Sequence, residues 1–166
     1  MDRLWAIWRV AYIRVANKQR GCIFCELPSE RKDFENLILL RSKYAFLMLN
    51  KFPYNPGHLM IAPYRHLGSL EFLKEEEVLD MWRLLKLSIR ALKETMAPDG
   101  FNIGINVGKV AGAGFEGHVH VHVVPRWNGD TNFMPIIANA KVISESLESV
   151  YRELRKVIDE VKEEKA

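Results

Sequence analysis

The sequence has no apolar run of about 18 residues, the length that a membrane-spanning helix requires. Its first residues, Met1 to Trp5, also lack the uninterrupted apolar segment of a secretory signal peptide. Only two cysteines occur, Cys22 and Cys25, and they are too few and too close together for the disulfide framework of a secreted domain. These absences argue against a membrane protein and predict a cytoplasmic location.

An excess of one charge is also missing. The formal net charge of the 166 residues is +3, and no basic tract with interleaved aromatic residues resembles a nucleic-acid site. We therefore expect no nucleic-acid partner, although this balance would not repel a polyphosphate. Internal repeats and linker-like segments are absent as well, so the length predicts a single domain over residues 1–166.

Three of the five histidines occupy alternate positions of one short segment, residues 118–124, and the remaining residues of that segment are all valines. In a β-strand, residues two apart share a face, so the pattern predicts His118, His120 and His122 side by side, with the valines toward a core. A half-buried strand that simply carries imidazoles on its polar face is the alternative. An ordinary polar face would use Thr, Lys or Glu, however, and three groups that titrate near neutrality favour a site for metal or phosphoryl chemistry.

The remaining pattern predicts the fold class. Apolar runs predict strands at residues 37–40, 45–49, 58–63 and 101–107, and helical spacing predicts helices at about 3–16, 70–96 and 144–163. The segment 27–34, which contains Pro28, reads as a loop. The two tryptophans of the N-terminal helix would pack on the domain itself, a second subunit or a ligand. This order predicts an α+β domain in which one long helix packs on a mainly antiparallel five-stranded sheet.

Two further motifs are ambiguous from the residues alone. Cys22 and Cys25 have the Cys-x-x-Cys spacing that lets two thiolates reach one zinc ion, but buried apolar cysteines or a redox pair would have the same spacing. The segment 108–117 contains four glycines and leads directly into the histidine run. Glycine lets backbone amides approach an anion, but a flexible connection would look the same.

The histidine run matches the His-φ-His-φ-His-φ-φ signature of the histidine triad (HIT) family, where φ is apolar. Residues 56–58, Pro-Gly-His, resemble the family's upstream active-site histidine, and Asn50 falls where members hold the ribose hydroxyls. Residues 106–108, Asn-Val-Gly, resemble the family's phosphate-binding segment. The resemblance covers about residues 22–127. The outlying segments 4–9, 21–25 and 127–134 resemble the branch typed as diadenosine tetraphosphate phosphorylases.

This resemblance implies an enzyme that cleaves a nucleoside phosphate at its α-phosphorus through a covalent nucleotidyl-histidine. It implies that His120 is the nucleophile, that His122 donates to a phosphate oxygen or the leaving group, and that His58 contacts the same phosphate. Core packing is the alternative for Phe46, and bracing a dimer is the alternative for Trp127 and Asn132. The residues expected to contact substrate are Asn50, Asn106, Gly108, Gly112, Gly114, Phe46, Trp127 and Asn132.

The resemblance also implies a structural zinc ion and no organic cofactor. Its four ligands would be Cys22, Cys25, His66 and His118, with no open coordination position. The alternative is a zinc-free core in which His66 is an ordinary loop histidine. Family members commonly pair through the long helix and the sheet edge, so we also expect a homodimer.

Diadenosine tetraphosphate is the favoured substrate among the adenosine polyphosphates. The triad does not decide whether water or inorganic phosphate attacks the intermediate. A nucleoside phosphoramidase or adenylyl-group hydrolase is the second possibility, and a nucleotide-binding regulatory protein with little turnover is the third.

Overall fold

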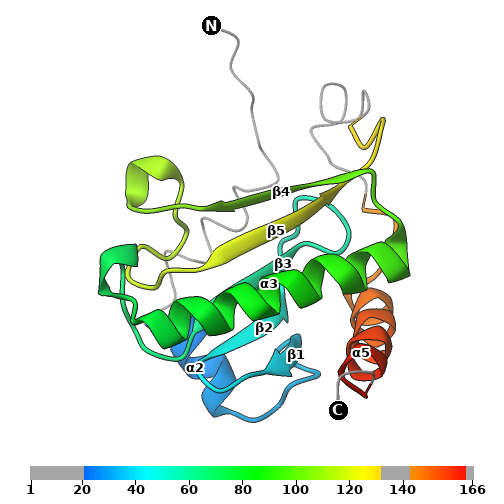
Figure 1. Ribbon diagram of the computed structural model, residues 1–166. Coiled ribbons are helices and arrows are strands. Elements are labelled where there is room, and N and C mark those ends of the chain that lie inside the picture. The colour runs from blue at the N-terminus through cyan, green and yellow to red at the C-terminus, as the bar shows by residue number, and fades with distance from the viewer. Residues whose placement is uncertain (1–20, 132–142, 164–166) are drawn as a thin grey trace, which may run out of the picture.

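The computed structural model describes residues 21–131 and 143–163. Its five strands form one antiparallel sheet in the order β1-β2-β3-β5-β4 (Figure 1). The α+β fold predicted from the sequence is therefore confirmed, whereas the predicted N-terminal helix at residues 3–16 lies outside the described residues. The strands are β1 (Ile38–Arg41), β2 (Ala45–Leu49), β3 (Leu59–Pro63), β4 (Gly100–Ile105) and β5 (Val121–Arg126).

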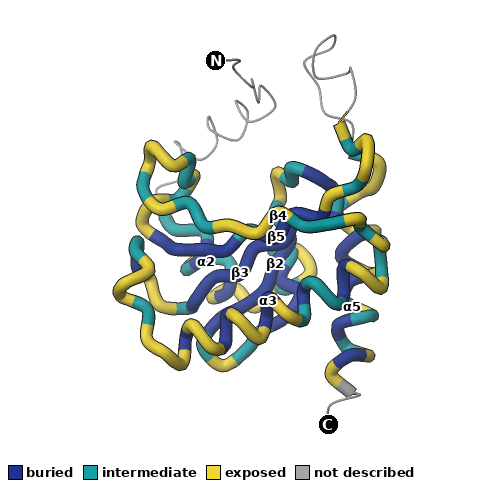
Figure 2. The backbone as a smooth tube through the Cα atoms, turned by 45° about the horizontal axis from the view of Figure 1, so that its top comes forward, coloured by how far each residue is buried: buried dark blue, intermediate teal, exposed yellow. Residues whose placement is uncertain are grey.

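Helices cover both faces of this sheet. The longest helix, α3 (Glu75–Met96), lies across one face, and α5 (Leu147–Glu163) lies on the same side beside β1 (Figure 1). The short helix α2 (Ile23–Ser29) covers the opposite face, where its Phe24 packs on apolar side chains of β1, β2 and β3. The buried positions are concentrated in β1, β2, β3 and β5 and on the sheet-facing side of α3 (Figure 2). No helix among the described residues is long and apolar enough to cross a membrane.

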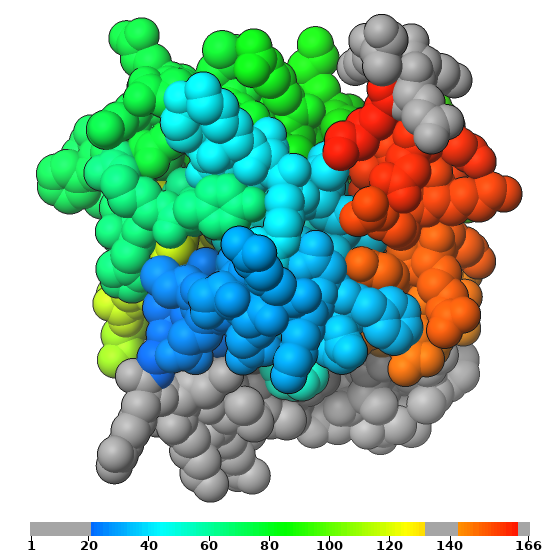
Figure 3. Space-filling model, turned by 90° about the horizontal axis from the view of Figure 1, so that it is seen from below, coloured from blue at the N-terminus to red at the C-terminus, as the bar shows by residue number. Residues whose placement is uncertain are grey.

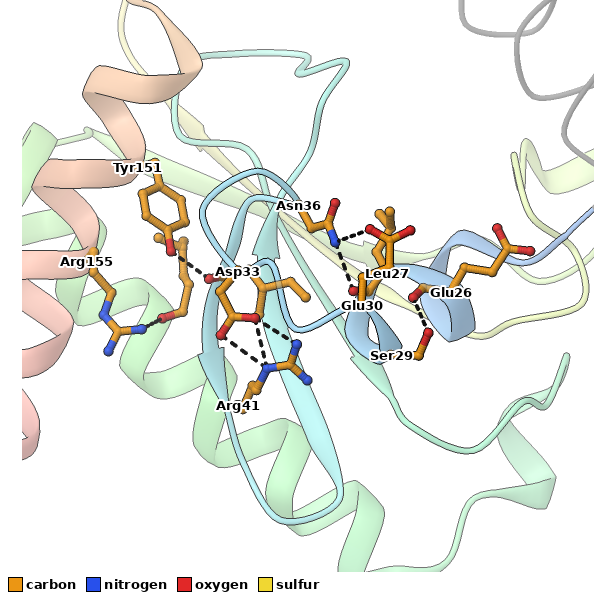
Figure 4. Close-up of polar contacts among 11 residues, drawn as sticks. Glu26, Leu27, Ser29, Glu30, Asp33, Asn36, Arg41, Tyr151 and Arg155 are labelled. Carbon is orange, nitrogen blue, oxygen red and sulfur yellow. Dashed lines mark hydrogen bonds and ion pairs between the residues drawn. The ribbon is translucent and has the colours of Figure 1, made fainter.

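Helix α5 is held against the edge strand β1 by two side chains. The Tyr151 hydroxyl donates to the carbonyl of Ile38 at 2.9 Å, and Arg155 Nη1 donates to the carbonyl of Leu39 at 2.9 Å (Figure 4). Seen from below, α5 lies beside the α2–β1 connection (Figure 3). These bonds satisfy carbonyls of an edge strand that would otherwise be open to a second chain.

The long helix begins later than its apolar spacing predicts. Residues 70–72 form a single 3₁₀ turn, η1, and Leu73 and Lys74 have extended backbone conformations. The Glu77 carboxylate accepts the backbone N–H of Lys74 at 2.8 Å, which satisfies one of the unpaired amides at the helix start. That hydrogen bond makes Glu75, not Leu70, the first residue of α3.

Helix α2 is not among the predicted elements, because residues 27–34 read as a loop. The helix has only 7 residues and contains Pro28, so neither periodicity nor composition indicates it. Burial of Phe24 and Pro28 against the sheet favours it instead. The helix places Cys22 and Cys25 within one turn of each other.

Candidate functional site

His122 is the only triad histidine that lies within a strand of the sheet. Its cross-strand neighbours are Met60 on β3 and Gly104 on β4. The ladder stops at Val121, and residues 118–120 precede the strand, so the predicted strand begins too early. Pro63 ends β3 and has no N–H to continue the pairing. Val119 instead donates its backbone N–H to the carbonyl of Leu67 at 2.7 Å.

The three triad rings nevertheless form one row on the α2 side of the sheet. The Phe24 ring lies 5.2 Å from the ring of His118 and 4.6 Å from that of His120, centroid to centroid. The His120 and His122 rings are 4.7 Å apart. Val119, Val121 and Val123 are buried, as the alternation predicts.

His58 completes the row from the turn that directly precedes β3. It is the last residue of a turn in which its N–H donates to the carbonyl of Asn55, with Pro56 second and Gly57 third at φ +73°. This arrangement is a type II turn, which favours proline and glycine at those positions. The turn presents a fully buried imidazole to His122.

Hydrogen bonds fix which nitrogen of His58 carries the proton. The backbone N–H of Tyr54 donates to His58 Nδ1 at 3.1 Å, so this nitrogen is an acceptor. The proton of a neutral His58 is then on Nε2, which lies 3.0 Å from His122 Nδ1. His122 Nδ1 accepts in turn, which places the proton of a neutral His122 on its Nε2.

His120 is held in the opposite tautomer. Its Nδ1–H donates to the carbonyl of His118 at 2.8 Å, which leaves the lone pair on Nε2. The side chain is only 4% exposed, and burial lowers the pKa of His120 below its usual value. A neutral imidazole with an oriented lone pair is a nucleophile near pH 7.

The four predicted metal ligands converge at the other end of the row. The Sγ–Nδ1 distances are 3.3 Å for Cys22 and His118, 3.6 Å for Cys25 and His118, and 3.4 Å for Cys25 and His66. All four candidate ligand atoms lie within 4.8 Å of one another. Tetrahedral zinc with ordinary Zn–S and Zn–N bonds requires sulfur–nitrogen separations of about 3.6 Å. The donor set therefore has both the chemistry and the size of a structural zinc site.

Surrounding groups orient these donors. His118 Nε2–H donates to the carbonyl of Pro63 at 2.8 Å, so its Nδ1 lone pair points into the cluster. Burial lowers the pKa of His118 to about 4, which keeps the ring neutral. Burial and the neighbouring Cys22 raise the pKa of Cys25 to about 11, so a second thiolate here requires a nearby cation.

Comparison with known proteins shows the family that the histidine run indicates. A HIT domain model matches residues 31–129. The chain belongs to the HIT family. An AP-4-A phosphorylase of Mycobacterium tuberculosis is 40% identical over 160 residues, which cover 92% of this chain and 82% of that protein.

Solved HIT structures show the same fold. A histidine triad nucleotide-binding protein from Sulfolobus tokodaii, described as hypothetical, matches with a TM-score of 0.69 and 24% identity, covering 85% of this chain and 94% of that one. A zinc-bound HIT protein from Mycobacterium smegmatis matches with a TM-score of 0.63 and 24% identity, covering 93% and 96%. At this identity the likeness concerns the fold alone.

One expected substrate contact lies beside a HIT histidine, and four others lie in the segment that follows β4. Asn50 follows β2, and its Nδ2 is 3.4 Å from His58 Nδ1. Asn106 follows β4 and donates to the carbonyl of Gly112 at 3.5 Å. Gly108 and Gly112 flank the 3₁₀ turn η2 (Lys109–Ala111) with φ of +79° and +90°, conformations that favour glycine. Gly114 lies in the same loop.

Two other expected contacts, Phe46 and Trp127, are engaged by other groups of the protein. Phe46 is 0% exposed and packs against the rings of Phe24 and Tyr64, so a ligand could touch it only if a neighbour moved. Trp127 Nε1 donates to the carbonyl of Met96 at the end of α3, at 3.3 Å. Asn132 lies outside the described residues.

Three contributors to the site are not indicated by the sequence. They are the Phe24 ring between two triad histidines, the backbone N–H of Tyr54 on His58, and the Pro63 carbonyl on His118. Two of them act through backbone atoms, which every residue has. The sequence therefore contains no signal that could have identified these two.

Proposed function

We propose that this chain cleaves adenosine polyphosphates at the α-phosphorus, with His120 as nucleophile. The observation that carries the proposal is the hydrogen bond from His120 Nδ1–H to the His118 carbonyl, which leaves Nε2 of a buried, neutral ring as the attacking atom. His58 and His122 complete the row of rings, and two consecutive hydrogen bonds determine which nitrogen of each ring carries the proton. Such preorganised groups contribute most where charge develops in the transition state.

The reaction proceeds in two displacements. Nε2 of His120 forms a bond to the α-phosphorus as the bond from phosphorus to the leaving polyphosphate oxygen breaks. His122 Nε2–H donates a hydrogen bond to that departing oxygen, and backbone amides of residues 106–114 hold the other phosphoryl oxygens. Inorganic phosphate or water then attacks the phosphorus, the phosphorus–nitrogen bond breaks, and His120 returns to its neutral form.

Diadenosine tetraphosphate is the favoured substrate. The similarity to a protein named AP-4-A phosphorylase, over 92% of this chain, supports this choice. Attack at one α-phosphorus releases ATP and leaves an adenylyl group on His120. Phosphate would convert that group to ADP, whereas water would convert it to AMP.

The test is incubation with diadenosine tetraphosphate in the presence and absence of inorganic phosphate. ATP plus ADP formed only with phosphate would establish phosphorolysis, and ATP plus AMP without phosphate would establish hydrolysis. An adenosine phosphoramidate, offered in parallel, tests for the alternative phosphoramidase activity. Tight AMP binding with no cleavage of either compound would contradict the proposal and favour a regulatory nucleotide-binding protein.

We further propose that Cys22, Cys25, His66 and His118 hold a structural zinc ion, which would cross-link three segments of the chain. The sulfur–nitrogen distances and the oriented lone pair of His118 support this. Both cysteines are free thiols, as a zinc site requires and as the proposed cytoplasmic location allows. Metal analysis of protein purified without added zinc tests the proposal, and clearly substoichiometric zinc would contradict it.

We also propose a homodimer that uses β4 and the exposed flank of α3. Strand β4 is an edge of the sheet, and its Ile103 is 45% exposed. On α3, Leu79 and Trp82 are 52% and 61% exposed. Among the described residues no strand pairs with the outer edge of β4, and an open edge together with large exposed apolar side chains favours pairing with a second copy. Light scattering on a sizing column should give a dimer for the native chain and a monomer for Ile103→Lys; a native monomer would refute the assignment.

A further inference from the structure

Asn55 is a buried polar residue that the proposed mechanism does not use. It is 2% exposed, although it belongs to the loop between β2 and β3. Most other buried polar side chains among the described residues have an evident role, since three are histidines of the two sites, Glu77 and Asp80 accept backbone amides, and Ser88 bonds within its own helix. A buried amide in a loop requires an explanation of its own.

Both N–H groups of the Asn55 amide are directed away from its own loop. Nδ2 donates to the carbonyl of Pro125 near the end of β5 at 2.9 Å, and to Asp130 Oδ2 at 2.7 Å. Asp130 also accepts two hydrogen bonds from Arg126, at 2.5 and 2.9 Å. The hydrogen bonds from Arg126, and to a smaller extent the one from Asn55, keep the pKa of Asp130 well below its usual range. The loop is thus fixed to β5 by a buried hydrogen bond to the Pro125 carbonyl, and to the segment after β5 by a partly buried, charge-assisted hydrogen bond to Asp130.

The same residue begins the turn that carries His58. The carbonyl of Asn55 accepts the N–H of His58 at 3.2 Å, and its neighbour Tyr54 provides the N–H that donates to His58 Nδ1 at 3.1 Å. Two backbone groups that determine the position of His58 therefore lie on Asn55 or directly before it.

We propose that Asn55 and Asp130 are positioning residues that fix the tautomer of His58. Their hydrogen bond holds the backbone N–H of Tyr54 against Nδ1, which keeps the His58 proton on Nε2 facing His122. The effect on the tautomer stands on the geometry alone. The effect on turnover rests on the proposed function, because it requires that His122 act on the phosphate.

The alternative is that this hydrogen bond only anchors the loop. Loss of the Asn55 amide would then lower the stability of the fold without changing the proton position on His58. Stability alone does not separate these two possibilities, and a direct measurement of the imidazole nitrogens does.

The test uses the full chain labelled with ¹⁵N in its histidines, because protonated and unprotonated imidazole nitrogens have well-separated chemical shifts. The variants are Asn55→Ala and the milder Asp130→Asn, which keeps the size of the side chain but removes its charge. The matched control is Tyr151→Phe, which removes one buried hydrogen bond, to the Ile38 carbonyl, from the α5 side of the molecule.

In the native protein we expect His58 with a protonated Nε2 and an unprotonated Nδ1. In Asn55→Ala the two nitrogens should show a mixture of tautomers, and in Asp130→Asn a smaller shift in the same direction. The kcat should fall about 10- to 100-fold with KM changed less than about threefold, because positioning rather than binding is lost. Tyr151→Phe should leave the spectrum and both constants unchanged.

A native-like His58 spectrum in folded Asn55→Ala would overturn the proposal. If that variant does not fold, a native-like spectrum in Asp130→Asn overturns it equally. If the native protein cleaves no nucleotide but its His58 tautomer depends on Asn55, the proposed function fails while the positioning role stands.

Discussion

His118 and His120 are joined through a single peptide carbonyl. The His118 ring points Nδ1 at the two cysteines, while its carbonyl accepts the Nδ1–H of His120 at 2.8 Å. One residue thus contributes its side chain to the proposed zinc site and its backbone carbonyl to the proposed nucleophile. At the scale of the residue, the two sites are separate in chemistry but not in position.

Replacement of His120 by Asn should abolish turnover. Asn keeps a polar side chain of smaller size but has no nucleophilic nitrogen, so kcat should fall by at least about 10³-fold. AMP binding, measured by calorimetry, should stay within about threefold of the native value, because His58 and His122 remain. Activity within about tenfold of the native enzyme would refute the role of His120 as nucleophile.

Gly57 is required by both conformation and space. Its φ is +73°, and an added Cβ would lie 2.7 Å from Met96 Sδ and 2.9 Å from Leu92 Cδ2. Gly57→Ala should therefore lower the free energy of unfolding by about 1–3 kcal/mol and reduce turnover, because His58 is the next residue. Gly100→Ala is the control, because nothing lies within 4 Å of its added Cβ. Urea titration of both variants, followed by assay, measures the difference.

At the scale of the element, the sequence predicts long and regular segments better than short ones. Helix α3 has apolar positions at helical spacing, and β1, β2 and β3 are continuous apolar runs because both of their faces are buried. Helix α2 has only 7 residues, too few for a period to emerge, and η1 interrupts an apolar spacing that continues through it. These elements depend on contacts with distant residues, such as Phe24 with the sheet, which local patterns do not record.

The residues of the site also differ in how far the sequence predicts them. His58, His66 and the triad can be recognised because imidazole is rare and its spacing is specific. Tyr54 and Pro63 act through backbone atoms, and Asn55 acts through partners 70 and 75 residues away, so neither type of contribution has a local signature.

The N-terminus of α3 makes a pH-dependent contribution to stability. The Arg65 guanidinium and the Lys74 amide lower the pKa of Glu77 from its ordinary 4.5 to about 2. A depressed carboxyl pKa stabilises the fold fully above about pH 4.5, and that contribution is lost as the pH falls toward about 2. Glu77→Gln should therefore lower the free energy of unfolding by about 1–2 kcal/mol at about pH 7, and by less at about pH 3.

Urea titrations at about pH 7, 4 and 3 measure this difference. Glu76→Gln is the matched control, because the neighbouring Glu76 is exposed in the same first turn. A difference between the native chain and Glu77→Gln that stays constant into the acid range would contradict the role of the Arg65–Glu77 pair.

At the scale of the whole molecule, the four proposed zinc ligands come from segments that are far apart in the chain. Cys22 and Cys25 lie at the start of α2, His66 follows β3, and His118 precedes β5. A bound zinc ion would therefore fix α2 against the sheet and hold the His118 carbonyl in place for His120. Loss of the ion should lower both stability and turnover, because the His118 carbonyl orients the His120 ring.

Cys25→Ser tests this link. Without its second thiolate the site should lose zinc, which lowers the free energy of unfolding by about 3 kcal/mol and Tm by about 6–12 °C. The kcat should fall about tenfold, as when a supporting group of a site is removed. Ser29→Ala, at the end of the same helix, should retain stoichiometric zinc and native kinetics. If Cys25→Ser loses its zinc but keeps the native kcat, the His118 carbonyl does not depend on the metal, and the two sites are energetically independent.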